Sequence, residues 1–293
     1  LGISLHTIDL SREFEEHVIT PFVRDYLSGR TPNPCAVCNK FVKFHLLRRA
    51  SRDKGYPAFA TGHYARVEKD PSNGPSLFRG ADPRKDQSYF LSLVGTEDLT
   101  DVRLPLGTWT KKKGKALLEK LGCRPVLHKE SQEVCFIPGN DYRSFLQTRI
   151  SELPGPGPVI DRTGVVMGEH EGLWRYTLGQ RRGLGIPHSE PLYVIDKIQE
   201  DNALVVGNRD ELLSQRCTLG DVNFLVPPER WSEEVLVQTV YRQRPKPALI
   251  RRNGSTLTIR FDSPLPRPCP GQVGAVYTSS GQVLAGGIIR ASL

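Results

Sequence analysis

The sequence predicts an α/β unit with a parallel sheet, followed by two β-rich units. Helix and strand patterns alternate up to Gly122, which favours an α/β layer. The stretch LPGPGP at 153–158 is incompatible with a helix and marks a change of architecture. Short apolar segments between turns follow it to the C-terminus. With 293 residues the chain is long enough for three domains, which we expect at 1–144, 145–212 and 213–293.

Two long helices are expected near the N-terminus. The first covers residues 11–28, with Ser11 as its N-cap and Gly29 as its left-handed stop. Its apolar side chains recur at four-residue spacing: Phe14, Val18, Phe22 and Tyr26. The second helix runs from about residue 39 to residue 54 and ends at Gly55.

Strands are expected on either side of these helices. Residues 4–10, SLHTIDL, alternate in polarity like the end of a strand, and residues 57–61, PAFAT, form a short apolar strand. Residues 111–121 are again helical, with Gly122 as their stop. This alternation is typical of parallel strands joined by helices.

Strand patterns dominate after residue 158 and indicate β-barrel or sandwich units. The apolar segments lie at 191–198, 203–207, 235–242, 255–261, 274–280 and 282–290. The dipeptide Asn253-Gly254 lies between two of them and predicts a hairpin. A Pro-rich link, SPLPRPCPG at 263–271, lies inside the last unit.

Composition narrows the functional classes. The net charge is +8 and the pI is about 9.2, which favours a polyanionic partner such as a nucleic acid. Six cysteines are too few for a disulfide scaffold, and their number indicates reduced cytosolic thiols. We therefore expect a cytoplasmic protein. No apolar run is long enough to cross a membrane, and the first ten residues lack the pattern of a signal peptide. Because the chain begins with Leu1, we expect further residues upstream.

The segment TPNPCAVCNK at 31–40 is the strongest candidate for chemistry. We expect Cys38 near the start of a helix, where the helix dipole, Lys40 and Lys43 would lower its thiol pKa. Cys35 and Cys38 also form a CxxC pair. It is compatible with a metal site completed by Cys123 and Cys135, with a thioredoxin-type redox pair, or with two structural cysteines.

Five further motifs are weaker when taken singly. They are ATGHYAR at 60–66, RKDQSYFL at 84–91, KESQEVCFIP at 129–138, YTLGQRRGLGI at 176–186 and YRQRPKPALIRR at 241–252. A glycine after a strand lets a ligand approach the backbone, which favours a role for Gly62, and His63 could contact a phosphate or a base. The last two motifs combine basic residues with glycines or an aromatic ring, a composition suited to RNA.

Six segments, in this order and spacing, resemble the tRNA-specific 2-thiouridylase family. They are TPNPCAVCNK, ATGHYAR, KDQSYFL, ESQEVCFIP, YTLGQRRGLGI and PGQ. The resemblance covers essentially the whole chain. It implies that the α/β unit is part of an adenine-nucleotide α-hydrolase-like parallel sheet and that the last unit is a β-barrel.

The resemblance also implies an activity. Family members use ATP, with Mg²⁺, to adenylate the C2 oxygen of the wobble uridine in tRNA, and a persulfide sulfur then replaces that oxygen. Cys135 matches the persulfide carrier, which receives sulfur from a relay protein or a cysteine desulfurase. Cys38 matches the catalytic cysteine, which ends in a disulfide with Cys135. Because the carrier must first reach a sulfur donor, we expect the segment around Cys135 to move.

Further roles follow from the resemblance position by position. Gly62 matches an ATP-contacting glycine. The positions that match tRNA contacts are Asn33, Pro34, Cys35, His63, Lys85, Asp86, Gln87, Tyr241, Arg242 and Gln272. Many members have Asp where this chain has Cys35, which leaves the role of that position open. Val240 stands where many members have Arg, and Arg242 and Arg244 are candidates to compensate.

The family's Ser-Gly-Gly-Val-Asp-Ser loop, which cradles the pyrophosphate of ATP, does not occur in these 293 residues. We therefore expect the chain alone to bind ATP poorly and to be inactive in isolation. Two alternatives remain open at this point. One is a non-catalytic tRNA-binding protein, and the other is an iron–sulfur centre held by Cys35, Cys38 and Cys135.

Overall fold

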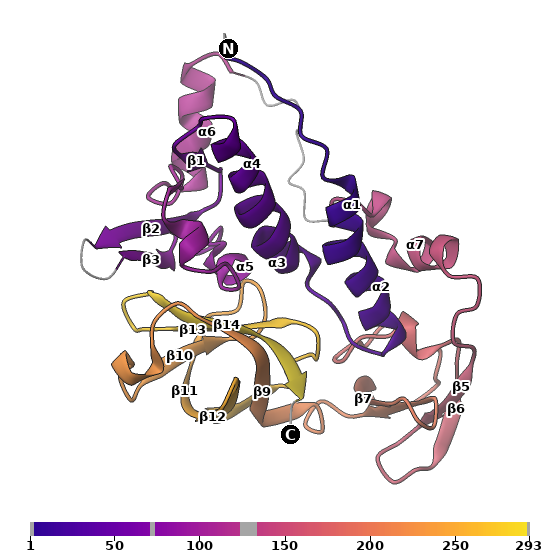
Figure 1. Cartoon of the computed structure of the whole chain (residues 1–293). Helices are drawn as coiled ribbons and strands as arrows, with labels where there is room; N and C mark the ends of the chain where they lie inside the picture. The colour runs from indigo at the N-terminus through magenta and orange to yellow at the C-terminus, as the bar shows by residue number, and fades with distance from the viewer. Residues whose placement is uncertain (1–2, 71–73, 124–133, 292–293) are drawn as a thin grey trace.

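A computed structural model describes residues 3–70, 74–123 and 134–291, with two helical rods above a β-barrel and a small sheet beside it (Figure 1). The first rod is continuous and consists of α1 (Ser11–Phe14), the π-helical segment η1 (Glu15–Ile19) and α2 (Thr20–Leu27). It ends before Gly29, whose φ of +69° is the left-handed conformation that glycine adopts without strain. The predicted helix at 11–28 is therefore confirmed, but Ser11 is its first helical residue and not its N-cap, which is Leu10 without a side-chain hydrogen bond.

The strand predicted at residues 4–10 is wrong. Residues 3–10 belong to no helix or strand, and Ile3 and Leu5 are 77% and 91% exposed. An alternating pattern forms a strand only where a neighbouring strand accepts its backbone hydrogen bonds. None of the described strands pairs with this segment.

The second rod begins earlier than predicted. It consists of α3 (Pro34–Cys38), η2 (Asn39–Leu47) and α4 (Arg48–Asp53), and it ends before Gly55. The early start has a local cause, because the side chain of Asn33 accepts a hydrogen bond from the backbone N–H of Ala36 at 3.2 Å and caps the helix. Pro34 then occupies the first helical position, where its missing N–H costs nothing.

The sheet of the α/β unit is small. The strands β1 (Phe59–Ala60) and β4 (Val102–Arg103) pair in parallel, while β2 (Ala65–Asp70) and β3 (Gly74–Arg79) form an antiparallel hairpin. Short helices complete this part of the chain: α5 (Ser88–Leu91), η3 (Glu97–Leu99), α6 (Lys111–Lys120), η4 (Pro138–Asn140) and α7 (Tyr142–Arg149). Parallel strands between helices confirm the predicted α/β character.

A four-stranded sheet follows, in the order β6-β5-β8-β7. Its elements are β5 (Gly157–Ile160), β6 (Val166–His170), the 3₁₀ turn η5 (Leu173–Arg175), β7 (Tyr193–Ile198) and β8 (Ala203–Gly207). The strands β5 and β8 are parallel, and the other pairs are antiparallel. Val159, Leu204 and Val206 are buried in its core.

The last unit is a closed barrel in the order β10-β11-β12-β9-β14-β13, as predicted. Its elements are β9 (Leu213–Phe224), η6 (Pro228–Arg230), β10 (Val235–Gln238), β11 (Lys246–Asn253), β12 (Thr256–Pro266), β13 (Val273–Tyr277) and β14 (Val283–Ala291). The predicted Asn253-Gly254 hairpin joins β11 to β12, with a φ of +58° at Gly254.

The barrel packs directly against the α/β unit. Tyr89 and Leu91 of α5 share one buried cluster with Val273 and Tyr277 of β13. The side-chain amide of Asn223 donates to the carbonyls of Ser92 and Val94 at 2.9 and 2.8 Å. This contact sets the barrel against the loops that carry the predicted site. Among the helices of the described ranges, none is both long and apolar enough to traverse a bilayer.

Candidate active site

The cysteine-bearing segment is built on the first turn of α3. Cys35 is the second helical residue and is exposed, whereas Cys38 is the last residue of α3 and is buried against Val18 and Val42. Cys38 is thus one turn away from the free N–H groups of the helix start. The dipole stabilises anions within the first turn only, so Cys35 is better placed to benefit.

The expectation of a lowered thiol pKa at Cys38 is wrong. Burial raises the pKa of Cys38 to about 11, and nearby Lys43 offsets only part of that effect. Burial also raises the pKa of Cys35. A protein interior disfavours the charged thiolate, and this cost exceeds the attraction of one lysine.

Cys135 lies in the same neighbourhood. Its negative charge, when ionised, is a further cause of the raised pKa at both Cys35 and Cys38. The next residue, Phe136, packs against the cluster of Val18, Cys38 and Val42, and its ring lies 5.6 Å from that of Phe14 and 5.3 Å from that of Phe22. Aromatic packing therefore anchors the chain while the thiol of Cys135 stays exposed.

All six cysteines are free thiols in this structure. The predicted Cys38–Cys135 disulfide and the predicted movement of the Cys135 segment therefore remain predictions. Residues 129–133 of the motif around Cys135 lie outside the described ranges. Within 3–70, 74–123 and 134–291, no group of three His, Cys, Asp or Glu side chains has the geometry to hold a metal ion.

The loop after β1 brings Gly62 and His63 to this site. Gly62 is exposed, and a Cβ added there would meet only Leu106, at an ordinary 3.7 Å. The Nδ1 of His63 is 2.7 Å from the hydroxyl of Thr61. Burial, and then Lys43, lower the pKa of His63 to about 4, so the ring is neutral at pH 7. A neutral imidazole suits a hydrogen bond to a base better than an ion pair with a phosphate.

Lys43 connects the parts of the site. Its charge lowers the pKa of Cys35, Cys38 and His63, so the ammonium group lies close to all three. The sequence indicated Lys43 as a source of positive potential but not this shared position. Thr61 and Phe136 were not singled out from the sequence at all. The Thr-x-His spacing and the aromatic residue after Cys135 are the features that could have identified them.

The Lys85-Asp86-Gln87 triplet divides into residues that face inward and one that lines a pocket. Asp86 is buried and pairs with Arg79 at 2.8 Å, while Gly80 and Ser88 also donate to its carboxylate. The side chain of Gln87 accepts a hydrogen bond from the backbone N–H of Tyr64 at 3.0 Å. Both residues hold the loops together.

Lys85 lines a pocket of about 840 Å³ between the α/β unit and the β10–β11 loop, called here the basic pocket. Its cationic lining residues are Arg79, Arg84, Lys85, Lys111, Lys112, Arg242 and Arg244. Tyr241 packs against Phe90 with ring centroids 4.5 Å apart, and Arg242 lies over the Tyr241 ring at 5.4 Å. Arg242 and Arg244 thus join Lys85 at one surface, whereas Val240 is half-exposed beside it.

Gln272 of the barrel holds the segment before α3. Its side-chain amide donates to the carbonyls of Thr31 and Pro32, each at 2.9 Å, and its oxygen accepts from Asn33 at 3.4 Å. The backbone N–H of Thr31 donates to the Pro270 carbonyl at 2.9 Å. Asn33 and Gln272 therefore form one network that positions the start of α3, rather than two separate surface groups.

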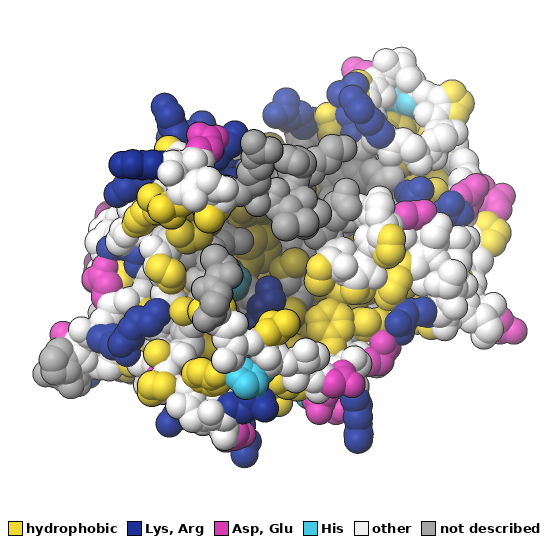
Figure 2. Space-filling model, turned by 90° about the horizontal axis from the view of Figure 1, so that it is seen from above, with side chains coloured by type: hydrophobic (Ala, Val, Ile, Leu, Met, Phe, Trp, Pro, Cys, Tyr) yellow, Lys and Arg dark blue, Asp and Glu magenta, His cyan; other side chains and the backbone are white. Residues whose placement is uncertain are grey.

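Seen from above, the helical face shows hydrophobic side chains gathered towards its centre, with Lys and Arg around them (Figure 2).

Three family models match along the chain. They are described as the tRNA methyl transferase HUP domain at residues 1–139, the tRNA methyl transferase PRC-barrel domain at 143–208 and the aminomethyltransferase β-barrel domain at 214–289.

The chain is also similar to proteins named tRNA-specific 2-thiouridylase MnmA. One from Nitratidesulfovibrio vulgaris strain Miyazaki F is 51% identical over 99% of this chain and 82% of its own length. Those of Lawsonia intracellularis and Geobacter metallireducens are 45% and 41% identical over the full chain, which covers 85% and 80% of their lengths. The chain belongs to the tRNA-specific 2-thiouridylase family. The matches to these relatives extend over 99–100% of the chain. They therefore include the cysteines, the Gly62 loop and the basic pocket.

Proposed function

We propose that this protein is a tRNA-uridine 2-sulfurtransferase, which replaces the C2 oxygen of the wobble uridine with sulfur. The observation that carries the proposal is the convergence of Cys35, Cys38 and Cys135 beside Lys43 and the Gly62 loop. The thiouridylase names of the relatives support it, because sulfur transfer needs thiols at a site that also admits a nucleotide.

The first step activates the uridine. A ring carbonyl has no leaving group, so ATP, with Mg²⁺, transfers AMP to the C2 oxygen and releases pyrophosphate. Gly62 is the residue proposed to face this nucleotide, and the open space around it supports close approach of a ligand to the backbone. His63, held by Thr61 and neutral at pH 7, is proposed to hydrogen-bond the target base.

The second step moves the sulfur. Cys135 is exposed, as a thiol must be to receive a persulfide from a relay protein or a cysteine desulfurase. As the outer sulfur of the Cys135 persulfide anion takes the proton of Cys38, the Cys38 sulfur attacks the inner sulfur as a thiolate. A Cys38–Cys135 disulfide forms, and the outer sulfur leaves as hydrosulfide, which keeps the Cys38 proton. Hydrosulfide displaces AMP at C2 and gives 2-thiouridine.

This order of events is compatible with the raised pKa of Cys38. Cys38 need not store a free thiolate, because its proton ends on the sulfur that it releases. The two cysteine sulfurs are oxidised, and the transferred sulfur is reduced from the sulfane to the sulfide level. A separate reductant must open the disulfide before the next cycle.

The basic pocket is proposed to hold tRNA backbone. It carries seven Lys or Arg side chains and one acid, Asp82, and it spans the α/β unit and the barrel. Phosphate contacts of this kind supply affinity and register rather than sequence information. Tyr241 is packed internally against Phe90, so we assign it to the support of Arg242 rather than to base stacking.

The test is ATP-dependent thiolation of unmodified glutamate or lysine tRNA with a persulfide donor, followed by digestion and mass spectrometry for 2-thiouridine. It is run with the 293-residue chain and with an extended form that adds the N-terminal segment of the Nitratidesulfovibrio relative. Formation of 2-thiouridine in either form supports the function. Because the sequence holds no Ser-Gly-Gly-Val-Asp-Ser loop, we expect the extended form to be the active one.

Two outcomes would contradict the proposal. If tRNA binds but no 2-thiouridine forms in either protein, a non-catalytic tRNA-binding protein becomes the better assignment. If anaerobically purified protein is coloured and contains iron, and its activity follows the iron content, the disulfide step is replaced by a cluster held by the same cysteines.

A further inference from the structure

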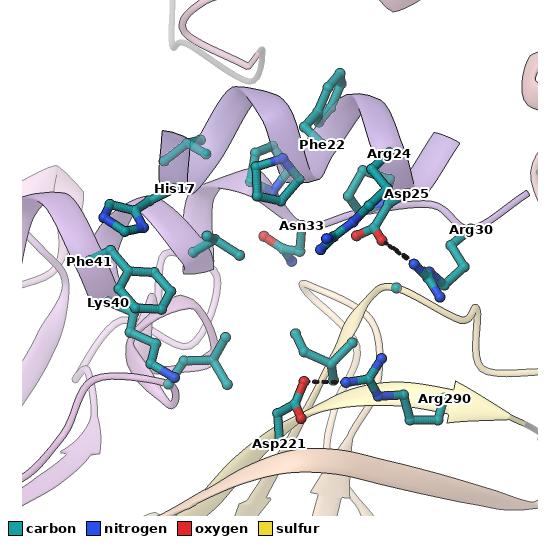
Figure 3. A pocket seen from close by; sticks show the side chains of 18 residues that line it. His17, Phe22, Arg24, Asp25, Arg30, Asn33, Lys40, Phe41, Asp221 and Arg290 are labelled. Atoms are coloured by element: carbon teal, nitrogen blue, oxygen red, sulfur yellow. Dashed lines mark hydrogen bonds and ion pairs between the residues drawn. The ribbon is translucent and has the colours of Figure 1, made fainter. Parts of the chain in front are cut away.

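A second pocket lies on the other side of α3, between the two helical rods and the barrel (Figure 3). Its volume is about 390 Å³. We call it the helix–barrel pocket. From the first rod and the segment after it come His17, Arg24, Asp25 and Arg30, from α3 and η2 come Pro34, Val37, Lys40 and Phe41, and from the barrel come Asp221 and Arg290.

One wall of the helix–barrel pocket is aromatic. The rings of His17 and Phe41 are stacked, with centroids 5.1 Å apart and planes 15° apart. Phe41 is 36% exposed, so part of its ring is accessible to a ligand. The Nζ of Lys40 lies 5.0 Å from the centre of the Phe41 ring. A flat, accessible ring with a cation beside it is suited to a nucleobase and its phosphate.

The charges of the pocket favour an anion. Both acids are already paired, Asp25 with Arg30 at 2.7 Å and Asp221 with Arg290 (Figure 3). Arg24 is exposed, and neither Arg24 nor Lys40 forms an ion pair with another described residue. Two cations are therefore left without an ion-pair partner among the described residues: Lys40 beside the aromatic wall, and Arg24 across the pocket from it, next to Asp25 (Figure 3).

The position of the pocket connects it to the thiols. Pro34 and Val37 line the helix–barrel pocket, while Cys35 and Cys38 belong to the same turns and face the Lys43 side. An α-helix with its side chains is about 10–12 Å across, which is the scale of one or two nucleotide steps. A strand whose reacting base reaches the thiols can therefore place a neighbouring nucleotide here.

We propose that the helix–barrel pocket binds a tRNA nucleotide next to the target uridine, with its base stacked on the His17–Phe41 pair and its backbone phosphates held by Lys40 beside that pair and by Arg24 across the pocket. The inference rests on the proposed function, because it takes tRNA as the substrate. The inference adds a specific role for the pocket. By binding the flanking nucleotide, the pocket would hold the target uridine out of the base stack and over the cysteines.

Two variants of the extended form, which carries the N-terminal segment of the Nitratidesulfovibrio relative, test this pocket. Phe41→Leu removes the ring and keeps an apolar side chain, and Arg24→Gln removes one unpaired charge. The matched control is Arg12→Gln, an exposed arginine on α1 of the same rod that does not line the pocket. Binding of unmodified tRNA is measured by fluorescence anisotropy at several salt concentrations, together with the thiolation rate and the KM for ATP.

We expect Phe41→Leu to weaken tRNA binding by about tenfold with little change in salt dependence, as for loss of one stacked base. We expect Arg24→Gln to weaken it by several-fold and to reduce the salt slope by about one. The KM for ATP should not change in either variant. The Kd of Arg12→Gln for tRNA should lie within about twofold of that of the parent, because this variant loses only one distant, screened surface charge.

Photocrosslinking gives an independent measurement. A tRNA carrying 5-iodouridine in place of a nucleotide next to the target should crosslink to the peptide that contains Phe41, and ATP should not compete. Binding within twofold of the parent for both variants, or crosslinking only to other peptides, would overturn the proposal. If the parent binds tRNA without thiolating it, the proposed function fails while the pocket is still judged by these two readouts. If the parent does not bind tRNA, both fail.

Discussion

The start of α3 and the Lys85-Asp86-Gln87 loop both meet the barrel, but they use their polar residues in opposite ways. At α3, the barrel residue Gln272 holds Thr31, Pro32 and Asn33 from outside, which leaves Cys35 exposed beside Cys135. In the loop, Asp86 and Gln87 turn inward and only Lys85 lines the basic pocket. A motif that matches a family thus mixes residues that build the site with residues that act in it.

The largest expected effect concerns the acting residues. In the extended form, Cys38→Ser and Cys135→Ser should each lower thiolation by at least about 10³-fold, because each removes one partner of the sulfur transfer. Thermal stability should stay close to that of the parent for Cys135→Ser, since its thiol is exposed. Cys123→Ser, at another exposed cysteine, is the control and should retain activity. Equal losses in all three variants would mean that the assay reports general thiol damage.

Asp86→Ala should show the opposite behaviour and act on stability. It removes an acceptor that serves Arg79, Gly80 and Ser88, and it leaves Arg79 without its partner. We expect a loss of about 3 kcal/mol in the free energy of unfolding, as for one broken buried ion pair. Urea denaturation measures it, with Arg244→Gln in the basic pocket as the control that weakens tRNA binding and leaves stability within about 0.5 kcal/mol. A stable Asp86→Ala protein with weak tRNA binding would reverse our division of the motif.

Gln272→Leu tests whether the barrel positions the cysteine helix. The substitution keeps the side-chain size and removes the hydrogen bonds to Thr31, Pro32 and Asn33. We expect kcat for thiolation to fall by about tenfold or more, since small displacements of reacting groups are costly. The Kd for tRNA should change less than kcat. A change confined to tRNA binding would instead support direct contact between Gln272 and the RNA.

Lys43 and His63 give a smaller effect that depends on pH. The folded-state pKa of His63, about 4, lies below its ordinary value of 6.5, so the unfolded chain binds the proton first as the pH falls. The stability that the lowered pKa of His63 contributes is therefore fully present above pH 6.5. It is lost progressively as the pH falls to about 4, at no more than about 1.4 kcal/mol per pH unit. His63→Gln should flatten the thermal stability profile in that window.

Lys43→Gln should raise the pKa of His63 and of both thiols, because it removes a positive charge near all three. The pH dependence of Cys35 alkylation should shift upward, and Lys43→Arg should restore it. An unchanged alkylation profile would show that Lys43 lies too far from the thiols to matter.

The sequence was sufficient for the parts of the fold that depend on local patterns. Four-residue spacing and Gly29 define the first helix, and Asn253-Gly254 defines the hairpin, because both signals lie within the element they form. The closed barrel also agreed with its strand pattern. The strand expected at 4–10 failed because pairing depends on a neighbouring strand, which a local pattern does not encode.

The candidate site was less predictable, because its chemistry depends on tertiary contacts. The thiol pKa of Cys38 is raised by burial against Val18, which comes from the other helical rod. Gln87 is engaged by the backbone of Tyr64, and Asn33 by Gln272 of the barrel. Spacing along the chain identified these residues, and only the packing showed what each of them faces.

The cluster that joins α5 to β13 has a consequence for how the molecule comes apart. Tyr89 and Tyr277 are fully buried, and they belong to one hydrophobic cluster shared by the α/β unit and the barrel. Cutting the chain before β9 would expose these rings on both pieces, so neither half should melt as a normal cooperative unit on its own. Force applied to the barrel by a bound macromolecule is transmitted through this cluster to the helix that carries the cysteines. The barrel is therefore expected to move together with the α/β unit that carries the cysteines, and not as a separate domain on a flexible linker.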